Sequence, residues 1–109
     1  MGDSMETYDA EIKRITKEII GKYHPSDIIL FGSCAKGTIK SGSDIDICVI
    51  METEDRRQAV RDMLFDLVDD FDVDIVVYTP AEWVKYKDDM AAFAGVINRT
   101  GRSLEKKQC

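Results

Sequence analysis

Two short segments of the chain carry aspartates in the same arrangement. Residues 44–50 (DIDICVI) and residues 72–78 (DVDIVVY) each begin with alternating acidic and aliphatic side chains and then become apolar. Because side chains alternate between the two faces of a β-strand, Asp44 and Asp46 would share one face, about 6.6 Å apart along the strand. The second segment repeats this plan. Each strand would therefore present aspartates on one face and bury its aliphatic residues on the other.

The two acidic segments are expected to lie side by side, because residues 53–70 between them carry a helical stripe and a helical crossover commonly joins parallel neighbours. Neighbouring strands are about 4.8 Å apart, so Asp44, Asp46 and Asp74 could converge on one patch. Three carboxylates this close repel one another unless cations are bound, and their oxygen atoms suit Mg²⁺ or Mn²⁺. Two ions about 3.5–4 Å apart would fit this span and would support in-line displacement at phosphorus.

A glycine-rich loop would supply the second half of such a site. Gly32 and Ser33 directly follow an apolar run at residues 27–31 (DIILF) that is typical of a strand. A glycine lets backbone N–H groups approach phosphate oxygens, and a serine hydroxyl adds a donor. If this first strand runs antiparallel to the second, the loop would face the acids and the sheet would be mixed.

Three residues near these motifs have open assignments. Lys36 could contact a phosphate or be solvated, and Cys34 could be a reactive thiol or a filler of the loop. We interpret Asp72 as a solvated or supporting acid rather than as a metal ligand.

The remaining pattern predicts the elements that position these residues. Helices are predicted over residues 6–22, 53–70 and 79–101, and strands over residues 27–31, 44–50 and 72–78. The last helix would begin at a capping box, TPAE, with proline at its first position, and would end near Gly101. Residues 102–109 could add a short edge strand or fray. The expected fold class is α+β, a small mixed sheet in a two-layer arrangement with helices packed on one face.

The apolar spacing also predicts the core residues of the helices. They are Tyr8, Ile12, Ile15, Ile19 and Tyr23 in the first helix, Val60, Met63, Leu64, Leu67, Val68 and Phe71 in the second, and Trp83, Phe93, Val96 and Ile97 in the third.

Composition limits the classes of function. The 109 residues, 44% hydrophobic and 33% charged, fit one globular domain with a core over about residues 6–105. The net charge of -6 argues against free DNA or RNA as a partner. The sequence contains neither an apolar run of roughly 18 residues nor a signal-peptide pattern, so we expect a cytoplasmic protein. Three cysteines without metal-binding spacing are expected to be free thiols.

Residues 32–50, GSCAKGTIKSGSDIDICVI, resemble the signature of the DNA polymerase beta nucleotidyltransferase superfamily, in which GS and a variable loop precede SDxDxxV. Asp74, in VDIVVYTP, matches the third acid of that superfamily, and the resemblance extends over roughly residues 6–105. It implies that Asp44 and Asp46 bind both metal ions and that Asp74 binds the catalytic ion and activates the acceptor hydroxyl. It also implies that Gly32 and Ser33 hold the triphosphate.

Within the superfamily, the chain is similar to the minimal nucleotidyltransferases, which often pair with helical HEPN proteins in toxin–antitoxin systems. The resemblance implies transfer of AMP, or another NMP, from a nucleoside triphosphate to a tyrosine of a HEPN-type toxin, with release of pyrophosphate. Larger members add a helical domain that grips the base and the acceptor. This chain has no residues left for one, so a partner or a second copy is expected to complete the site.

Two other functions stay open at this point. The chain could be an antitoxin that masks its partner by binding alone, with aspartates that serve only the structure. It could also be a nucleotidyltransferase for a small molecule such as an aminoglycoside, although a second domain is then expected. Neither the acceptor, nor the preferred base, nor the oligomeric state follows from the sequence.

Overall fold

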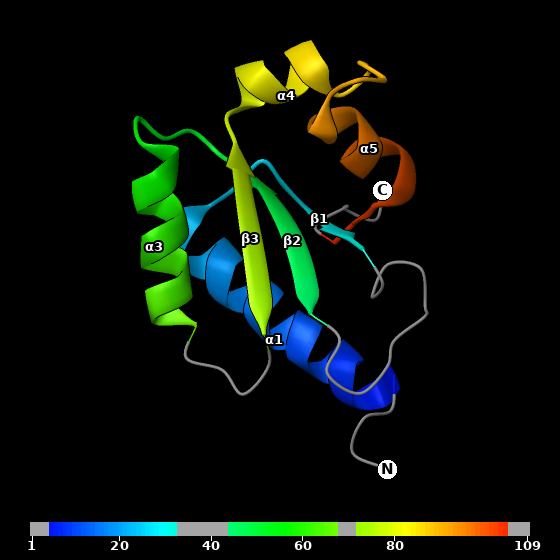
Figure 1. Cartoon of the computed structure of the whole chain (residues 1–109). Coiled ribbons are helices and arrows are strands. Elements are labelled where there is room, and N and C mark those ends of the chain that lie inside the picture. The colour runs from blue at the N-terminus through cyan, green and yellow to red at the C-terminus, as the bar shows by residue number, and fades with distance from the viewer. Residues whose placement is uncertain (1–4, 33–43, 68–71, 105–109) are drawn as a thin grey trace, which may run out of the picture.

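The computed structural model describes residues 5–32, 44–67 and 72–104, which form helices and one sheet (Figure 1). The helices are α1 (Met5–Tyr23), α3 (Arg56–Asp66), α4 (Pro80–Tyr86) and α5 (Phe93–Thr100). The strands are β1 (Asp27–Phe31), β2 (Ile45–Ile50), β3 (Val73–Tyr78) and β4 (Arg102–Ser103). None of the helices in these ranges is long and apolar enough to cross a membrane.

The sheet has the strand order β3-β2-β1-β4 and is mixed, as predicted. β2 and β3 are parallel neighbours joined through α3, whereas β1 runs antiparallel to both β2 and β4. The predicted α+β class is therefore confirmed. The open question about the residues after Gly101 is also answered, because Arg102 and Ser103 pair with Leu30 and Ile29 as a short edge strand.

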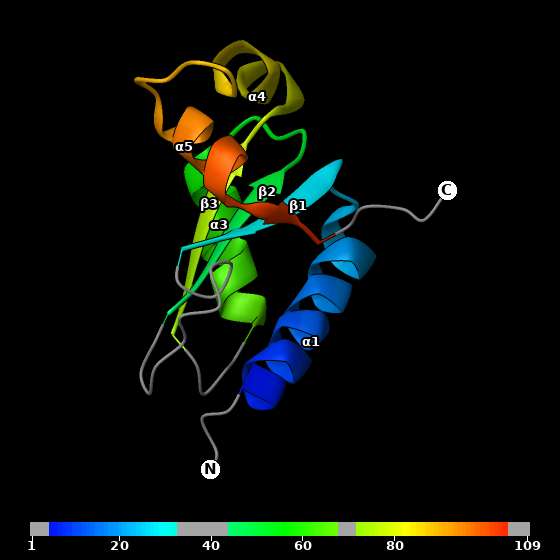
Figure 2. The ribbon, with the colours of Figure 1, turned by 90° about the vertical axis from the view of Figure 1, so that its right-hand side faces the viewer.

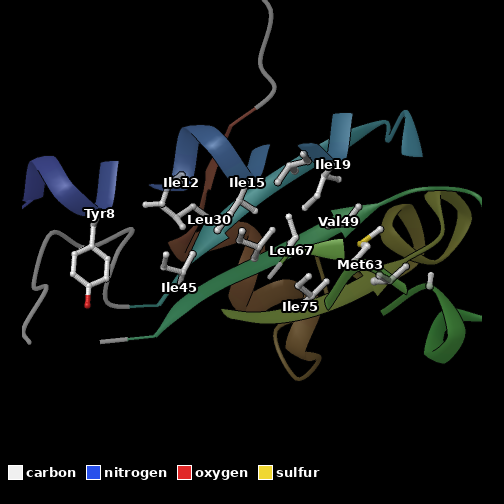
Figure 3. Packing of buried hydrophobic residues seen from close by; sticks show 14 residues of the cluster. Tyr8, Ile12, Ile15, Ile19, Leu30, Ile45, Val49, Met63, Leu67 and Ile75 are labelled. Carbon is white, nitrogen blue, oxygen red and sulfur yellow. The ribbon is translucent and has the colours of Figure 1, made fainter. Parts of the chain in front are cut away.

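The main core lies between one face of the sheet and the helices α1 and α3 (Figure 3). The α1 stripe points at the sheet as expected, with its Ile15 and Ile19 almost completely buried. The buried members of this cluster are Tyr8, Ile12, Ile15, Ile19, Ile28, Leu30, Ile45, Ile47, Val49, Ala59, Met63, Leu67, Ile75 and Val77. Tyr23 is partly buried at its edge, where its hydroxyl donates a 2.6 Å hydrogen bond to Asp66.

Helix α3 contributes fewer core residues than its sequence stripe predicted. Asp55 caps its N-terminus by accepting a hydrogen bond from the backbone N–H of Gln58. Met63 and Leu67 are buried as expected, but Leu64 is 42% exposed because the buried line of the helix runs at four-residue spacing from Ala59. Two further predicted stripe residues, Val68 and Phe71, lie outside the described residues.

The opposite face of the sheet carries a smaller apolar cluster. Helices α1 and α3 pack on one face as expected, and α5 packs on the other. Ile29, Cys48 and Ile50 of the strands are buried there against Ile97 of α5. Figure 2 shows α1 and α5 on opposite sides of β1. The partly buried residues around this cluster are Phe31, Tyr78 and Trp83. Val96, which was expected in the core, is instead 41% exposed.

The last predicted helix is wrong in one respect, because it is two helices. The capping box is present, with Thr79 and Glu82 exchanging side-chain-to-backbone hydrogen bonds at the start of α4. The helix ends at Tyr86, and a turn separates it from α5. In that turn the Asp89 carboxylate accepts a 2.9 Å hydrogen bond from the backbone N–H of Ala91. Such local side-chain bonds compete with a continuous helix, and periodicity does not reveal them.

We expect Gly101→Ala to destabilise the protein, because α5 turns into β4 in close contact with β1. An added Cβ would lie 2.6 Å from Cγ2 of Ile29 and 2.7 and 2.9 Å from the backbone oxygens of Ile97 and Leu30. The free energy of unfolding should fall by roughly 1–3 kcal/mol, measured by urea denaturation. Gly21→Ala is the matched control, since no atom lies within 4 Å of the added Cβ in helix α1. It should be neutral or stabilise by up to about 1 kcal/mol. Equal effects of the two substitutions would contradict this account.

Candidate active site

Three aspartates meet at one edge of the sheet. Asp44 directly precedes β2, Asp46 lies within β2, and Asp74 lies within β3. Each offers a carboxylate oxygen, and these oxygens all lie within 4.8 Å of one another. The structure therefore brings together the three acids that the sequence predicted to converge.

The burial of the neighbouring aliphatic residues explains why the acids share a face. Ile45 and Ile47 are both completely buried against α1 and α3, so Asp46 between them must point to the opposite face. Asp74 is the direct partner of Asp46 in the parallel pairing of β2 and β3. The pairing starts at the acidic end, where the backbone N–H of Ile45 donates a 2.8 Å hydrogen bond to the carbonyl of Asp72.

Burial and the neighbouring charges both act on Asp46, the central member of the cluster. The pKa of Asp46 is raised to about 6, first by burial and then by the negative charges of Asp74 and Asp44 and by a hydrogen bond with Asp74. Asp46 is only partly exposed, whereas Asp44 and Asp74 are exposed. The same crowding that disfavours the ionised form of Asp46 would favour a bound divalent cation.

The chain leaves β1 directly against this cluster. Phe31, the last residue of β1, is the register partner of Asp46, and Gly32 follows with a φ of 76°. A Cβ on Gly32 would collide with Oδ2 of Asp46 and would lie 3.2 Å from its Cγ. Glycine is therefore required here both by the backbone conformation and by the space that the carboxylate occupies. The predicted phosphate loop thus begins beside the acids.

The remaining predicted site residues are not all described. Ser33 and Lys36, like Cys34, lie outside the described residues. Asp72 is exposed and does not belong to the group of three acids, and its backbone carbonyl pairs with β2.

The structure places one aromatic residue near the site in a different environment from the one that the sequence predicted. Phe93 was expected in the core, but it is 52% exposed, and its ring contacts that of Phe31 beside the acids. Its spacing from Ile97 is that of a core position, but Phe93 is the first residue of α5 and its ring contacts Phe31 at the end of β1.

The donor set fits divalent cations that prefer oxygen. Three carboxylates supply oxygen atoms alone, which is the chemistry of Mg²⁺ and Mn²⁺ sites rather than of zinc or copper sites. Backbone N–H groups at a glycine next to such a cluster can hold phosphate oxygens near the cations. The arrangement can therefore bind a metal–triphosphate and support displacement at phosphorus.

Without divalent cations, we expect the protein to lose stability as the pH rises from 5 to 7.5. The folded pKa of Asp46, about 6, lies above the value of 3.8 for an ordinary aspartate, so the folded state binds more protons than the unfolded state in this window. The loss should be about 1 kcal/mol, because solvent screens a partly exposed carboxylate. Urea denaturation in EDTA should show Asp46→Asn to be more stable than wild type at pH 7.5 and equal to it near pH 4.5. A pH-independent difference would contradict the assignment.

Comparison with known proteins places this geometry in a family. The family model described as "Nucleotidyltransferase domain" matches residues 10–94, which include Gly32 and all three aspartates. A putative nucleotidyltransferase from Sulfolobus solfataricus has the same fold, with a TM-score of 0.56, 24% identity, and coverage of 72% of this chain and 73% of that one. A crystal structure of a toxin–antitoxin with AMP-PNP is similar with a TM-score of 0.53 and 27% identity, over 91% of this chain and 73% of that one.

A search of curated proteins gave no significant match. The family assignment therefore depends on the family model, which spans well over half of the chain and contains the acids that the structure brings together. The chain belongs to the nucleotidyltransferase domain family.

Proposed function

We propose that this protein transfers AMP from ATP to a hydroxyl group of a HEPN-type helical toxin and thereby acts as its antitoxin. The observation that carries the proposal is the convergence of Asp44, Asp46 and Asp74 beside Gly32 in a member of the nucleotidyltransferase domain family. The similar toxin–antitoxin structure with AMP-PNP supports an adenine nucleotide as the substrate and a toxin as the partner. The proposed place of action is the cytoplasm.

Each site residue of this chain would have a separate role in the transfer reaction. Asp44 and Asp46 would supply metal ligands from β2, and Asp74 would supply a ligand from β3 and receive the proton of the acceptor hydroxyl. Two Mg²⁺ ions, or Mn²⁺, would neutralise the charge on the triphosphate when bound. Gly32 would hold phosphate oxygens through its backbone, with Ser33 and Lys36 as further contacts. The acceptor oxygen forms a bond to the α-phosphorus, the bond to the β-phosphate oxygen breaks, and pyrophosphate leaves.

The competing function is masking of the partner by binding alone. Apolar side chains are exposed on α4 and in the turn before α5, with Val84 at 68% and Met90 at 78%, and such residues suit a binding surface. Masking, however, needs no acids held within 4.8 Å of one another, and such crowding destabilises a protein that does not bind cations. The cluster therefore favours catalysis over masking. A small-molecule acceptor, such as an aminoglycoside, is a third possibility that the acids alone do not distinguish.

Saturating Mg²⁺ with ATP should raise the melting temperature by several degrees. Ligand at 100 times its dissociation constant stabilises the folded state by about 2.7 kcal/mol, which in a domain of this size is a shift of that order. Differential scanning fluorimetry with and without EDTA would measure it, and Asp46→Asn should lose most of the shift. An unchanged melting temperature in the presence of intact ATP would argue against the metal site.

Asp46→Asn and Asp74→Asn should abolish nucleotide transfer without abolishing partner binding. Each substitution keeps the side-chain shape and removes one charge that holds the cations, so transfer should fall by roughly two orders of magnitude or more. The assay uses α-³²P-labelled ATP, Mg²⁺ and a candidate HEPN-type partner protein, with binding measured separately by a pull-down. Asp62→Asn, on the exposed surface of α3, is the matched charge control.

The two functions separate in a toxicity assay. Catalytic antitoxin activity requires that both aspartate variants bind the toxin and fail to neutralise it. If the variants neutralise the toxin as well as the wild type does, masking is the correct function.

A further inference from the structure

Two phenylalanine rings form a pair at the border of the acid cluster. Phe31 ends β1, and Phe93 begins α5, 62 positions later in the chain. Their ring centroids are 5.7 Å apart and their planes meet at 84°, which is the edge-to-face geometry that aromatic pairs favour. The contact joins the first residue of α5 to the strand end that leads into Gly32.

The pair lies on the same face of the sheet as the acids. Phe31 packs with the cluster that contains Cys48, and Asp46 shares the face of Cys48 because the two are separated by one residue in β2. Phe31 and Asp46 are direct register partners, so their Cβ atoms are about 5 Å apart. The ring of Phe93 contacts the ring of Phe31, so a single residue, Phe31, links Phe93 to Asp46 in this chain of neighbours.

Phe93 contributes little to the core of the protein. Helix α5 buries Ala94, Gly95 and Ile97, whereas Phe93 is 52% exposed. Its ring contacts that of Phe31, and about half of its surface is open to solvent. An exposed aromatic ring carries no argument by itself, but this one packs edge-to-face on a second ring that borders the proposed triphosphate site.

We infer that Phe93, supported by Phe31, is the platform on which the base of the nucleoside triphosphate stacks, an inference that rests on the proposed function. With the phosphates held by Gly32 and the cations at the aspartates, the ribose separates the α-phosphate from the base. Phe93 borders the acids through Phe31, on the same face of the sheet, and a base that extends along this face from the α-phosphate would meet its ring. Because the phenyl ring is uncharged, stacking on it raises the affinity of the protein for the nucleotide without changing the charge of the acid cluster.

Stacking on a phenyl ring also predicts which class of base the protein prefers. Stacking depends on the area of contact and tolerates every base, and the larger ring system of a purine covers more of Phe93 than a pyrimidine does. ATP and GTP should therefore bind more tightly than CTP and UTP, with little difference between the two purines from this contact.

The test compares two ligands that differ in whether they carry a base. ATP and inorganic tripolyphosphate are titrated into the full chain by calorimetry in the presence of Mg²⁺. Phe93→Ala should weaken ATP binding about tenfold and leave tripolyphosphate binding unchanged, because only ATP loses a stacking partner. Phe93→Trp should retain ATP binding, whereas Phe93→Leu, which keeps an apolar side chain in the contact with Phe31, should lose it.

Phe65→Ala is the matched control. Phe65 is 82% exposed on α3, which packs against the face of the sheet opposite to the acids, so its removal should change neither affinity. Unfolding of Phe93→Ala would be seen in its melting curve, and Phe93→Leu would then carry the comparison.

The outcomes distinguish this inference from the function on which it rests. If the wild type binds both ligands and Phe93→Ala binds ATP normally, the base platform is wrong and the nucleotidyltransferase proposal stands. Equal weakening of both ligands would show that Phe93 only supports the fold of the site. If the variant loses the partner protein but keeps ATP, Phe93 belongs to a docking surface instead. A wild type that binds neither ligand would overturn both the inference and the proposed function.

Discussion

The repulsion among three carboxylates is the constraint on which this site depends. Oxygens of Asp44, Asp46 and Asp74 are held within 4.8 Å of one another, and the energy that holds them there must come from elsewhere in the fold. It comes from the aliphatic residues that alternate with the acids, because Ile45, Ile47 and Ile75 are buried on the other face against α1 and α3. A slip of one residue in β2 would turn these side chains to solvent and the aspartates into the core. The register is therefore secured by the same core that stabilises the protein.

The register of β1 and β3 on β2 places the other parts of the site next to Asp46. Asp46 pairs with Asp74 on one side and with Phe31 on the other, so Gly32 leaves the strand directly over its carboxylate. The proposed metal ligands, phosphate loop and base platform thus share one reference point. Antiparallel pairing is essential to this arrangement, because a parallel β1 would carry its C-terminal end to the opposite end of the sheet.

The sequence was sufficient to predict the convergence of the three acids, but not the break between α4 and α5. Two-residue alternation in residues 44–50 and 72–78 determines which face each side chain takes, and the helix between them implies parallel neighbours, so the three acids could be found without a structure. The break between α4 and α5 could not, since it depends on a local hydrogen bond of Asp89. The environment of Phe93 was also predicted incorrectly, because Phe93 has the helical spacing of the buried Ile97 but lies at the first residue of α5, half exposed against Phe31.

On the face of the sheet that α5 covers, β2 changes from fully buried at Cys48 to partly exposed at Asp46, two residues away. Cys48 is fully buried under α5, and its burial, followed by the charge of Asp27, raises the pKa of its thiol to about 12. Asp46 lies on the same face, two residues before Cys48 and paired with Phe31 of this cluster, and burial is the largest cause of its raised pKa. A carboxylate at such a border is poorly hydrated, and a cation that replaces the missing water recovers more electrostatic energy there than it would on an open surface. Partial burial beside this cluster therefore makes Asp46 a better ligand for a divalent cation than a fully exposed aspartate would be.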